Sequence, residues 1–490
     1  MRPLLLLLAA LLAPPASAQD LPAGPPAPPN LLLILADDLG PGDPAHANPA
    51  SRIPTPQLDR LAREGMRFSD AHSPSAVCSP TRYGLLTGRY AWRTRLKRGV
   101  LWGNDPMLIE DDRPTLASML QEAGYATAVV GKWHLGLGAF DPERPEAKTD
   151  FAQPLTSGPH TVGFEHSFVL PSSLDIPPYV YVVGDRPRAP ADTVVPGSEQ
   201  RRDGGSGFWR KGPAEAGFDH ERTLPLLAEE AEAFLRRHRA EHPEQPFFLY
   251  FPLTAPHTPW LPTAGFRGRS GAGHYGDFVA QVDAVLGRML TVLEETGAAE
   301  DTLVIFTSDN GAHWTAQDRY LHAHNANLEF RGQKADIHEG GHRVPFLARW
   351  PGRIAAGEES AALIGLNDVY ATVAELLGHA PAPGEAPDSV SFLRCLLEGA
   401  PGERQELVHH SIDGMFALRA GPWKLVEGLG SGGFTGPTRM APLPGGPTGQ
   451  LYRLDRDPSE RRNLWPDHPE VAARLSARLA AIRSQEGAER

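Results

Sequence analysis

Residues 76–89 read Ala76-Val77-Cys78-Ser79-Pro80-Thr81-Arg82-Tyr83-Gly84-Leu85-Leu86-Thr87-Gly88-Arg89, and they hold one of the two cysteines in a chain of 490 residues. Arg82 follows Cys78 by four positions, and its guanidinium suits a tetrahedral oxyanion. The stretch predicts a short helix that begins near Ser79 and ends at Gly88. Free backbone N–H groups at the start of such a helix would face Cys78 and favour a bound anion.

Two buried strands are expected at residues 31–35 and 302–306, and each is followed by a pair of oxygen-bearing side chains. Ligands of open α/β sheets bind beyond the carboxyl ends of the strands. Adjacent acids repel unless a cation lies between them, and oxygen ligands suit calcium or magnesium rather than zinc. Taken alone, the pair after the first strand could also be a solvated turn. The four side chains are Asp37, Asp38, Asp309 and Asn310.

Two further strand ends carry titratable groups. The expected strand at residues 125–130 leads into Lys132 and His134, and the strand at 247–251 is followed by His257 between two prolines. A surface turn is the plain alternative for the first segment. For His257 the plain alternative is a packed or surface histidine.

Helical patterns alternate with these strands, which predicts an α/β fold. Residues 140–217 have poor periodicity and are expected to form long active-site loops, with a short hairpin at 179–183. There Tyr179 or Trp209 could stack on a substrate ring, although ordinary packing is the plainer reading. Short strands at 415–418, 423–426 and 451–454 and a final helix are expected near the C-terminus. The other expected helices cover residues 56–64, 114–123, 222–238, 275–293 and 367–377.

Composition limits the function classes. The formal net charge is −12, which argues against nonspecific nucleic-acid binding. Two cysteines do not make a disulfide framework, although a Cys78–Cys395 bridge is the plain alternative to a functional thiol. The histidines at 313, 322, 324, 338 and 342 fit no standard zinc spacing.

The N-terminus predicts export. Arg2 precedes an apolar run over residues 4–12, and Ala16-Ser17-Ala18 forms a cleavage site, so residues 1–18 are expected to be a signal peptide. A buried N-terminal helix is the alternative. Residues 19–29 are expected to be a proline-rich spacer. The apolar run is too short to span a bilayer, and no stable membrane anchor is expected.

The Cys-x-Pro-x-Arg pattern followed by Leu-Thr-Gly-Arg resembles the signature of the type I sulfatases, in the alkaline phosphatase superfamily. Three later segments resemble the same family: Gly131-Lys132-Trp133-His134, Ala255-Pro256-His257, and Gly332-x-Lys334 with its Glu-Gly-Gly-x-Arg-Val-Pro continuation. The resemblance implies a large, mixed, mostly parallel sheet sandwiched by helices, in a catalytic domain over residues 30–380. A smaller C-terminal subdomain over residues 381–490 would hold an antiparallel sheet and a helix.

The resemblance also implies the chemistry. A maturation enzyme would oxidise Cys78 to formylglycine, whose hydrate is the nucleophile. Calcium would be held by Asp37, Asp38, Asp309 and Asn310, with the modified Cys78 as a further ligand. Arg82, Lys132 and Lys334 would contact sulfate, His134 would assist sulfate release, and His257 would protonate the leaving oxygen. The implied substrate is a sulfated carbohydrate or an aryl sulfate, met in the periplasm, outside the cell, or in the lysosome of a eukaryote.

Three other functions remain open from the sequence. The same fold can hydrolyse phosphomonoesters or phosphonate esters. An unmodified Cys78 could leave a protein that binds sulfated glycans without cleaving them. A cysteine hydrolase using Cys78 with His134 or His257 is the third, but it leaves the four oxygen ligands unexplained.

Overall fold

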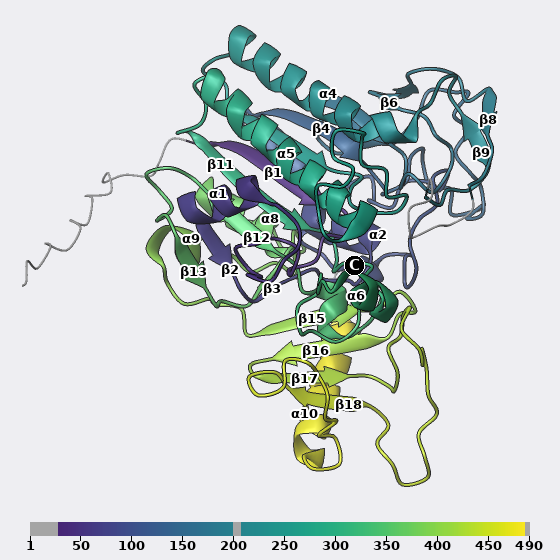
Figure 1. Ribbon diagram of the computed structural model, residues 1–490, viewed down its shortest axis with the longest axis vertical. Helices are drawn as coiled ribbons and strands as arrows, with labels where there is room; N and C mark the ends of the chain where they lie inside the picture. The colour runs from purple at the N-terminus through teal and green to yellow at the C-terminus, as the bar shows by residue number, and fades with distance from the viewer. Residues whose placement is uncertain (1–27, 199–206, 486–490) are drawn as a thin grey trace, which may run out of the picture.

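A computed structural model describes residues 28–198 and 207–485, and a ten-stranded mixed sheet forms its centre (Figure 1). Across the sheet the strands lie in the order β13 (Glu358–Ser360), β2 (Met66–Phe68), β12 (Phe346–Arg349), β11 (Thr302–Ser308), β1 (Asn30–Ala36), β10 (Phe247–Pro252), β4 (Ala126–Lys132), β5 (His166–Leu170), β6 (Val182–Val183) and β7 (Arg186–Pro187). The five strands from β11 to β5 run parallel. Outside them the pairing is antiparallel, except between β13 and β2. The expected mostly parallel sheet is confirmed.

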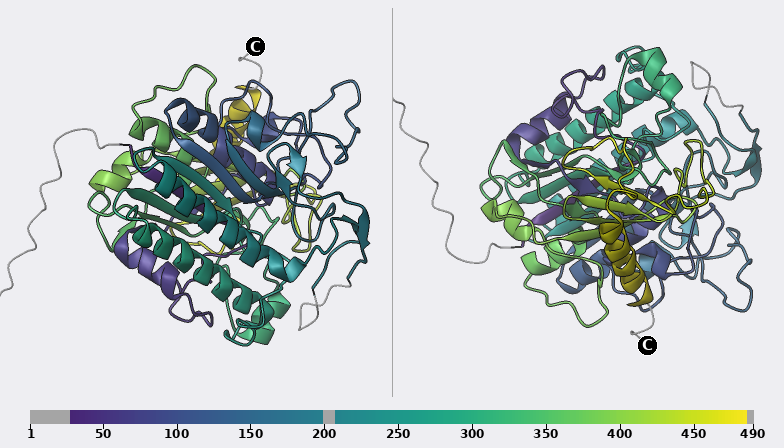
Figure 2. Two further views of the ribbon diagram at one scale, coloured as in Figure 1. Left: turned by 90° about the horizontal axis from the view of Figure 1, so that it is seen from above. Right: turned by 90° about the horizontal axis from the view of Figure 1, so that it is seen from below.

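Helices cover both faces of this sheet (Figure 2). Side chains alternate along β1, so its leucines at 31, 33 and 35 enter one core while residues 32, 34 and 36 enter the other. The first core includes α2 (Cys78–Thr87), α3 (Leu116–Glu122), α8 (Asp368–Leu376) and α9 (Leu393–Glu398). The second includes α1 (Pro56–Glu64), α4 (His220–Glu241) and α5 (Gly273–Glu295). The sandwich of helices around the sheet is therefore also confirmed.

A small antiparallel sheet lies beside the large one, at the bottom of Figure 1. Its strands are β15 (Glu406–His410), β16 (Phe416–Ala420), β17 (Trp423–Val426) and β18 (Gln450–Arg453). The final helix, α10 (Pro469–Ser484), packs Leu475 and Leu479 against one face of it. Ile337, which precedes this sheet in the chain, joins a small apolar cluster with it.

The expectation of loops over residues 140–217 is wrong where β5 adds to the central sheet beside β4. This strand begins with His166 and Ser167, so its apolar run is short, and the sheet rather than local pattern determines it. The hairpin expected at 179–183 is formed slightly later by β6 and β7. Remaining short elements are β3 (Ala71–His72), β8 (Thr193–Val195), β9 (Gly212–Ala214), β14 (Ile364–Gly365), α6 (Ala316–His322), α7 (Glu339–His342) and two 3₁₀ turns (Ala91–Arg93, Pro159–Thr161).

Cys78 and Cys395 are both buried free thiols, so the alternative of a bridge between them is wrong. The expected signal peptide and residues 19–27 of the expected spacer lie outside the described residues. Within residues 28–198 and 207–485, no helix combines the length and apolarity needed to cross a membrane.

Candidate active site

Four neighbouring parallel strands deliver their polar ends to one place. Asp37 and Asp38 follow β1, Asp309 and Asn310 follow β11, His257 follows β10, and Lys132 is the last residue of β4. These strands are adjacent in the order β11, β1, β10, β4. Because parallel strands end at the same edge of a sheet, the sequence pattern of polar strand ends becomes one cluster.

Cys78 enters this cluster as the first residue of α2. The helix has no side-chain cap at Val77, and it ends at Gly88 with φ of 62°. The predicted helix is therefore confirmed. The Cys78 side chain is buried, and burial raises the pKa of its thiol although Lys132 and Lys334 act in the opposite direction. A raised pKa disfavours the thiolate that a cysteine hydrolase needs.

Three cations pair with three carboxylates at the centre of the cluster. Arg82 contacts Asp309 at 2.7 Å, Lys132 Nζ lies 2.7 Å from Asp37 Oδ2, and Lys334 Nζ donates to Asp38 Oδ2 at 2.9 Å. All six side chains are buried. The fixed charges therefore cancel, and a divalent cation added here would leave a net positive charge for an anionic substrate.

The oxygen atoms of the cluster fit such a cation. Asp37 Oδ1 and Asn310 Oδ1 are buried and have no hydrogen-bond partner, a costly state that a bound cation would remove. Ligand atoms of Asp37, Cys78 and Asp309 lie within 4.8 Å of one another. Burial and the charge of Asp37 raise the pKa of Asp309 to about 6, as expected for carboxylates brought together. The carboxylate and amide oxygens of this set suit calcium or magnesium.

His134 is held as a neutral base. Its backbone has φ of 58°, an uncommon conformation that the surrounding structure must stabilise. Its Nε2 lies 2.8 Å from the Leu101 carbonyl, so Nε2 carries the proton, and the buried Nδ1 has a free lone pair and no partner. Burial, with the charges of Lys132 and Arg82, holds the pKa of His134 well below its usual range. This histidine can accept a proton at Nδ1.

His257 approaches the same carboxylates from β10. Its Nδ1 lies 2.6 Å from the Thr258 carbonyl and donates to it, and its Nε2 lies 3.8 Å from Asp38 Oδ2. Nε2 is therefore the nitrogen that can exchange a proton with a substrate. All ten residues that the sequence singled out for the site lie in this one cluster or border it.

Sequence reasoning missed several groups that hold the cluster in place. Asp43 accepts from the backbone N–H of Gly40, from Tyr275 and from His324, and so fixes the loop after Asp38. The carbonyl of Leu101 orients His134. A backbone carbonyl gives no residue-type signal, and an aspartate in a Gly-rich turn is ordinary, so neither position stands out in a sequence.

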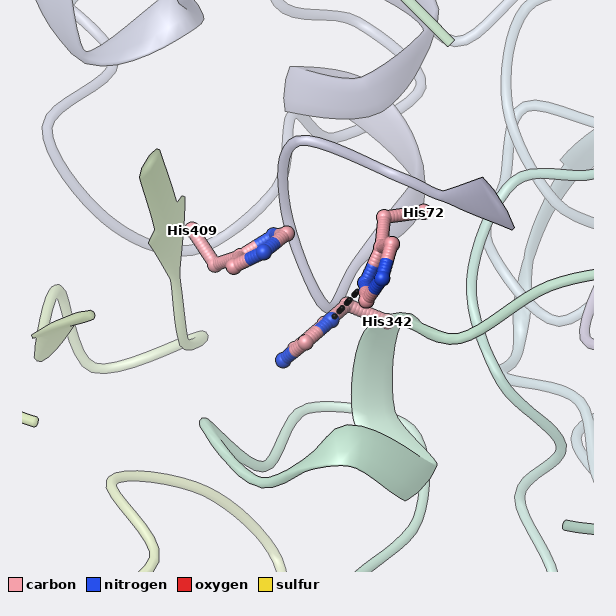
Figure 3. Close-up of side chains that lie close together, drawn as sticks. All are labelled: His72, His342 and His409. Carbon is pink, nitrogen blue, oxygen red and sulfur yellow. Dashed lines mark hydrogen bonds between the residues drawn. The ribbon is translucent and has the colours of Figure 1, made fainter. Parts of the chain in front are cut away.

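A second cluster brings together His72, His342 and His409 (Figure 3). Lys424 contacts His342 Nε2 at 2.9 Å, His342 Nδ1 lies 3.0 Å from His72 Nδ1, and His72 Nε2 lies 2.8 Å from Asp70. The His342 and His409 rings stack 3.8 Å apart and 11° from parallel. Lone pairs in stacked parallel rings do not converge on one ion, so these contacts form a hydrogen-bonded chain rather than a metal site.

Comparison with known proteins agrees with this arrangement. The Sulfatase family profile matches residues 29–379. An N-acetylgalactosamine-6-O-sulfatase of Bacteroides thetaiotaomicron is 34% identical over 93% of each chain. Arylsulfatase A of Bos taurus is 34% identical over 91% of this chain and 85% of its own.

Solved structures of other proteins have the same fold. One from a study of glycosaminoglycan metabolism by Bacteroides thetaiotaomicron has a TM-score of 0.82 and 33% identity, covering 93% of this chain and 99% of its own. A phosphonate monoester hydrolase of Agrobacterium radiobacter shares the fold, with a TM-score of 0.58 and 20% identity over 94% of this chain and 96% of its own. The chain belongs to the sulfatase family and hydrolyses sulfate esters.

Proposed function

We propose that this sulfatase cleaves sulfate from a carbohydrate, with a formylglycine made from Cys78 and a bound calcium ion. The observation that carries the proposal is the oxygen cluster around Cys78, in which three carboxylates are each paired with a fixed cation while two buried oxygens remain unpartnered. Calcium would be held by Asp37, Asp38, Asp309, Asn310 and the modified Cys78. Bound there, it would shield the negative oxygens of a sulfate ester.

The formylglycine would supply two hydroxyl groups on one carbon, so that sulfate leaves by breaking a C–O bond. The other steps fall to side chains of this chain. Arg82, Lys132 and Lys334 are each paired with a carboxylate, and a cation bound to those carboxylates would leave their positive charge to act on the sulfate group. His134 accepts a proton at its free Nδ1, and His257 gives one to the leaving alcohol from Nε2.

A carbohydrate substrate is supported by the similarity to a bacterial N-acetylgalactosamine-6-O-sulfatase over 93% of both chains. The similarity to arylsulfatase A keeps a small aryl sulfate as a substrate to test. We also propose export to the periplasm or the extracellular space, because residues 1–18 have the pattern of a signal peptide. The mature protein would then begin at Gln19.

The first experiment is a mass spectrum of the tryptic peptide Phe68–Arg82 from active protein of the native host. A peptide lighter by the difference between a thiol and an aldehyde, and reactive to hydrazide, is expected. An unmodified thiol in fully active protein would overturn the proposed nucleophile. An unmodified thiol in inactive protein would favour a glycan-binding role.

Turnover then separates the reaction classes. Sulfated sugars, aryl sulfates, phosphomonoesters and phosphonate monoesters should be compared under one set of conditions, with Cys78→Ala as the control that cannot form the aldehyde. Sulfate esters should exceed the phosphorus esters in kcat/KM by more than about tenfold. A preference for phosphorus esters would reassign the main activity within the same fold.

A further inference from the structure

Trp102 has an exposed aromatic side chain on a backbone that is fixed by hydrogen bonds. It is 49% exposed. The backbone N–H of Trp102 donates to Asp105 Oδ2 at 2.7 Å, and its backbone carbonyl accepts from the Asp105 N–H at 3.1 Å. At the next residue, Gly103, a Cβ atom would come within 2.4 Å of the Pro177 carbonyl oxygen, so the loop is packed tightly. An exposed ring on a fixed backbone costs little entropy when it binds a ligand.

The backbone next to Trp102 contacts the segments that carry Cys78 and His134. The Leu101 carbonyl accepts from His134 at 2.8 Å, and the Leu101 N–H donates to Ser79 Oγ at 3.1 Å, next to Cys78. Consecutive Cα atoms are about 3.8 Å apart, so Trp102 is one residue away from contacts to both catalytic segments.

Arg210 contacts the Trp102 ring and forms an ion pair with Asp175. The Arg210 guanidinium lies over the Trp102 ring, 5.2 Å from its centroid, and donates to Asp175 Oδ2 at 2.6 Å. Asp175 is 7% exposed, yet its Oδ1 has no partner. It lies four residues after Pro171, whose carbonyl accepts from the His134 N–H at 3.1 Å. A buried carboxylate oxygen without a donor is costly, and a hydroxyl group of a ligand would remove that cost.

We propose that Trp102, Arg210 and Asp175 form the subsite for the pyranose ring that carries the sulfate. This inference rests on the proposed function, and it names the residues that would recognise the carbohydrate. The ring of Trp102 packs against the apolar C–H face of the sugar, Asp175 Oδ1 accepts from a sugar hydroxyl, and Arg210 donates to a sugar oxygen. A phenyl sulfate can stack on Trp102 but offers no hydroxyl to Asp175, so the subsite selects sugars over aryl esters.

The test is the ratio of kcat/KM for a sulfated hexosamine to that for a small aryl sulfate. Asp175→Asn keeps the size of the side chain and should lower this ratio by about tenfold or more. Trp102→Ala should lower kcat/KM for the sugar, mainly through KM. Two variants on other elements serve as controls: Arg222→Ala removes an exposed arginine paired with Glu229 on α4, and Tyr320→Ala removes an exposed ring on α6. Neither control should change the ratio.

Equal losses on both substrates in Asp175→Asn would mean that Asp175 only supports the fold, and would overturn the subsite. The absence of any loss on either substrate would overturn it as well. Binding separates this result from a failure of the proposed chemistry, because calorimetry on the inactive Cys78→Ala protein needs no turnover. The sulfated hexosamine should bind to this inactive protein, and adding Trp102→Ala should raise the Kd about tenfold. Hexosamine binding that is indifferent to Trp102 and Asp175 would rule the subsite out even in an active sulfatase.

Discussion

At the scale of single residues, the charges of the site are balanced, and its oxygen atoms would fit a divalent cation. Each of Asp37, Asp38 and Asp309 already has a cationic partner, and yet Asp37 Oδ1 and Asn310 Oδ1 have no hydrogen-bond partner. The residues therefore account for charge pairing but not for all oxygen atoms. The proposed calcium ion would bind these remaining oxygen atoms, since calcium takes six to eight oxygen ligands.

Calcium should therefore stabilise the folded protein. At a concentration about 100 times its Kd, it should add about 2.7 kcal/mol, measured as a rise in melting temperature after chelation and readdition. Asp38→Asn should remove most of this rise. Asp277→Asn is the matched control, because Asp277 is equally buried but accepts from Gly268 and Ser270 outside the site. A calcium response that survives Asp38→Asn would place the ion elsewhere.

At the scale of elements, α2 determines where Cys78 lies. The helix is fully buried and is ended by Gly88, whose φ of 62° is left-handed. A Cβ atom at Gly88 would come within 2.4 Å of the Ala386 Cβ, so the end of the helix is packed as well as conformationally restricted. A shift at this end would move Cys78 at the other.

Gly88→Ala should cost about 3 kcal/mol or more, the sum of left-handed strain and overpacking. The matched control is Gly124→Ala after α3, where φ is 87° and no atom lies within 4 Å of the added Cβ. The control should cost only about 1–2 kcal/mol, the strain alone. Thermal melting measures both, and equal costs would mean that the contact with Ala386 relaxes freely.

The elements that sequence reasoning found are those with strong local signals. Strands β1, β10 and β11 are continuous apolar runs, and α1, α4 and α5 have clear helical stripes, so their positions were predictable. Strand β5 was not, because its His166 and Ser167 resemble a loop until neighbouring strands bury them. Trp102 was missed for a related reason: its exposure depends on how the loops pack, which no local pattern encodes.

At the scale of the whole molecule, a buried ion cluster joins the small C-terminal sheet to the catalytic part. Lys424 of β17 lies 3.0 Å from Glu339 of α7 and 2.9 Å from Glu460, and all three side chains are buried. Burial, opposed by Lys424 and reinforced by Glu339, raises the pKa of Glu460 to about 7. Lys424 thus lies between two carboxylates that would otherwise repel each other, and Arg343 supplies a second positive charge to Glu339 at 2.9 Å.

Lys424→Met should destabilise the protein by about 3–5 kcal/mol, because it leaves buried charge unpaired. Adding Glu460→Gln to it should recover part of the loss, since one of the two facing charges is then removed. The control Arg394→Met breaks an exposed pair with Glu398 and should cost less than about 1 kcal/mol. Melting curves of the four proteins give the comparison, and a Lys424→Met protein as stable as the control would contradict the role of the cluster.

Buried histidines should make the whole molecule less stable in acid. Burial lowers the pKa of His338 to about 3, and of His220 and His410 to about 4, whereas these groups titrate near 6.5 when unfolded. Between these values the unfolded chain binds more protons, so stability is full above pH 6.5 and falls as the pH drops toward 4. Glu460 and Asp283 oppose this trend, because burial raises the pKa of each to about 7. The histidines are more numerous, since burial also holds the pKa values of His134, His342 and His409 well below 6.5, and the melting temperature should therefore fall between pH 7 and pH 4.5.

The contribution of one histidine can be isolated. His338→Gln removes a proton site that is buried against Gln450, and should reduce the slope of unfolding free energy by about 1.4 kcal/mol per pH unit within that window. His468→Gln, at a half-exposed position beside Glu470, is the control and should leave the slope unchanged. A melting temperature that rises on acidification would mean that the raised carboxyl groups dominate. The same series at constant ionic strength distinguishes the two outcomes, because the carboxyl groups and the histidines shift stability in opposite directions as the pH falls.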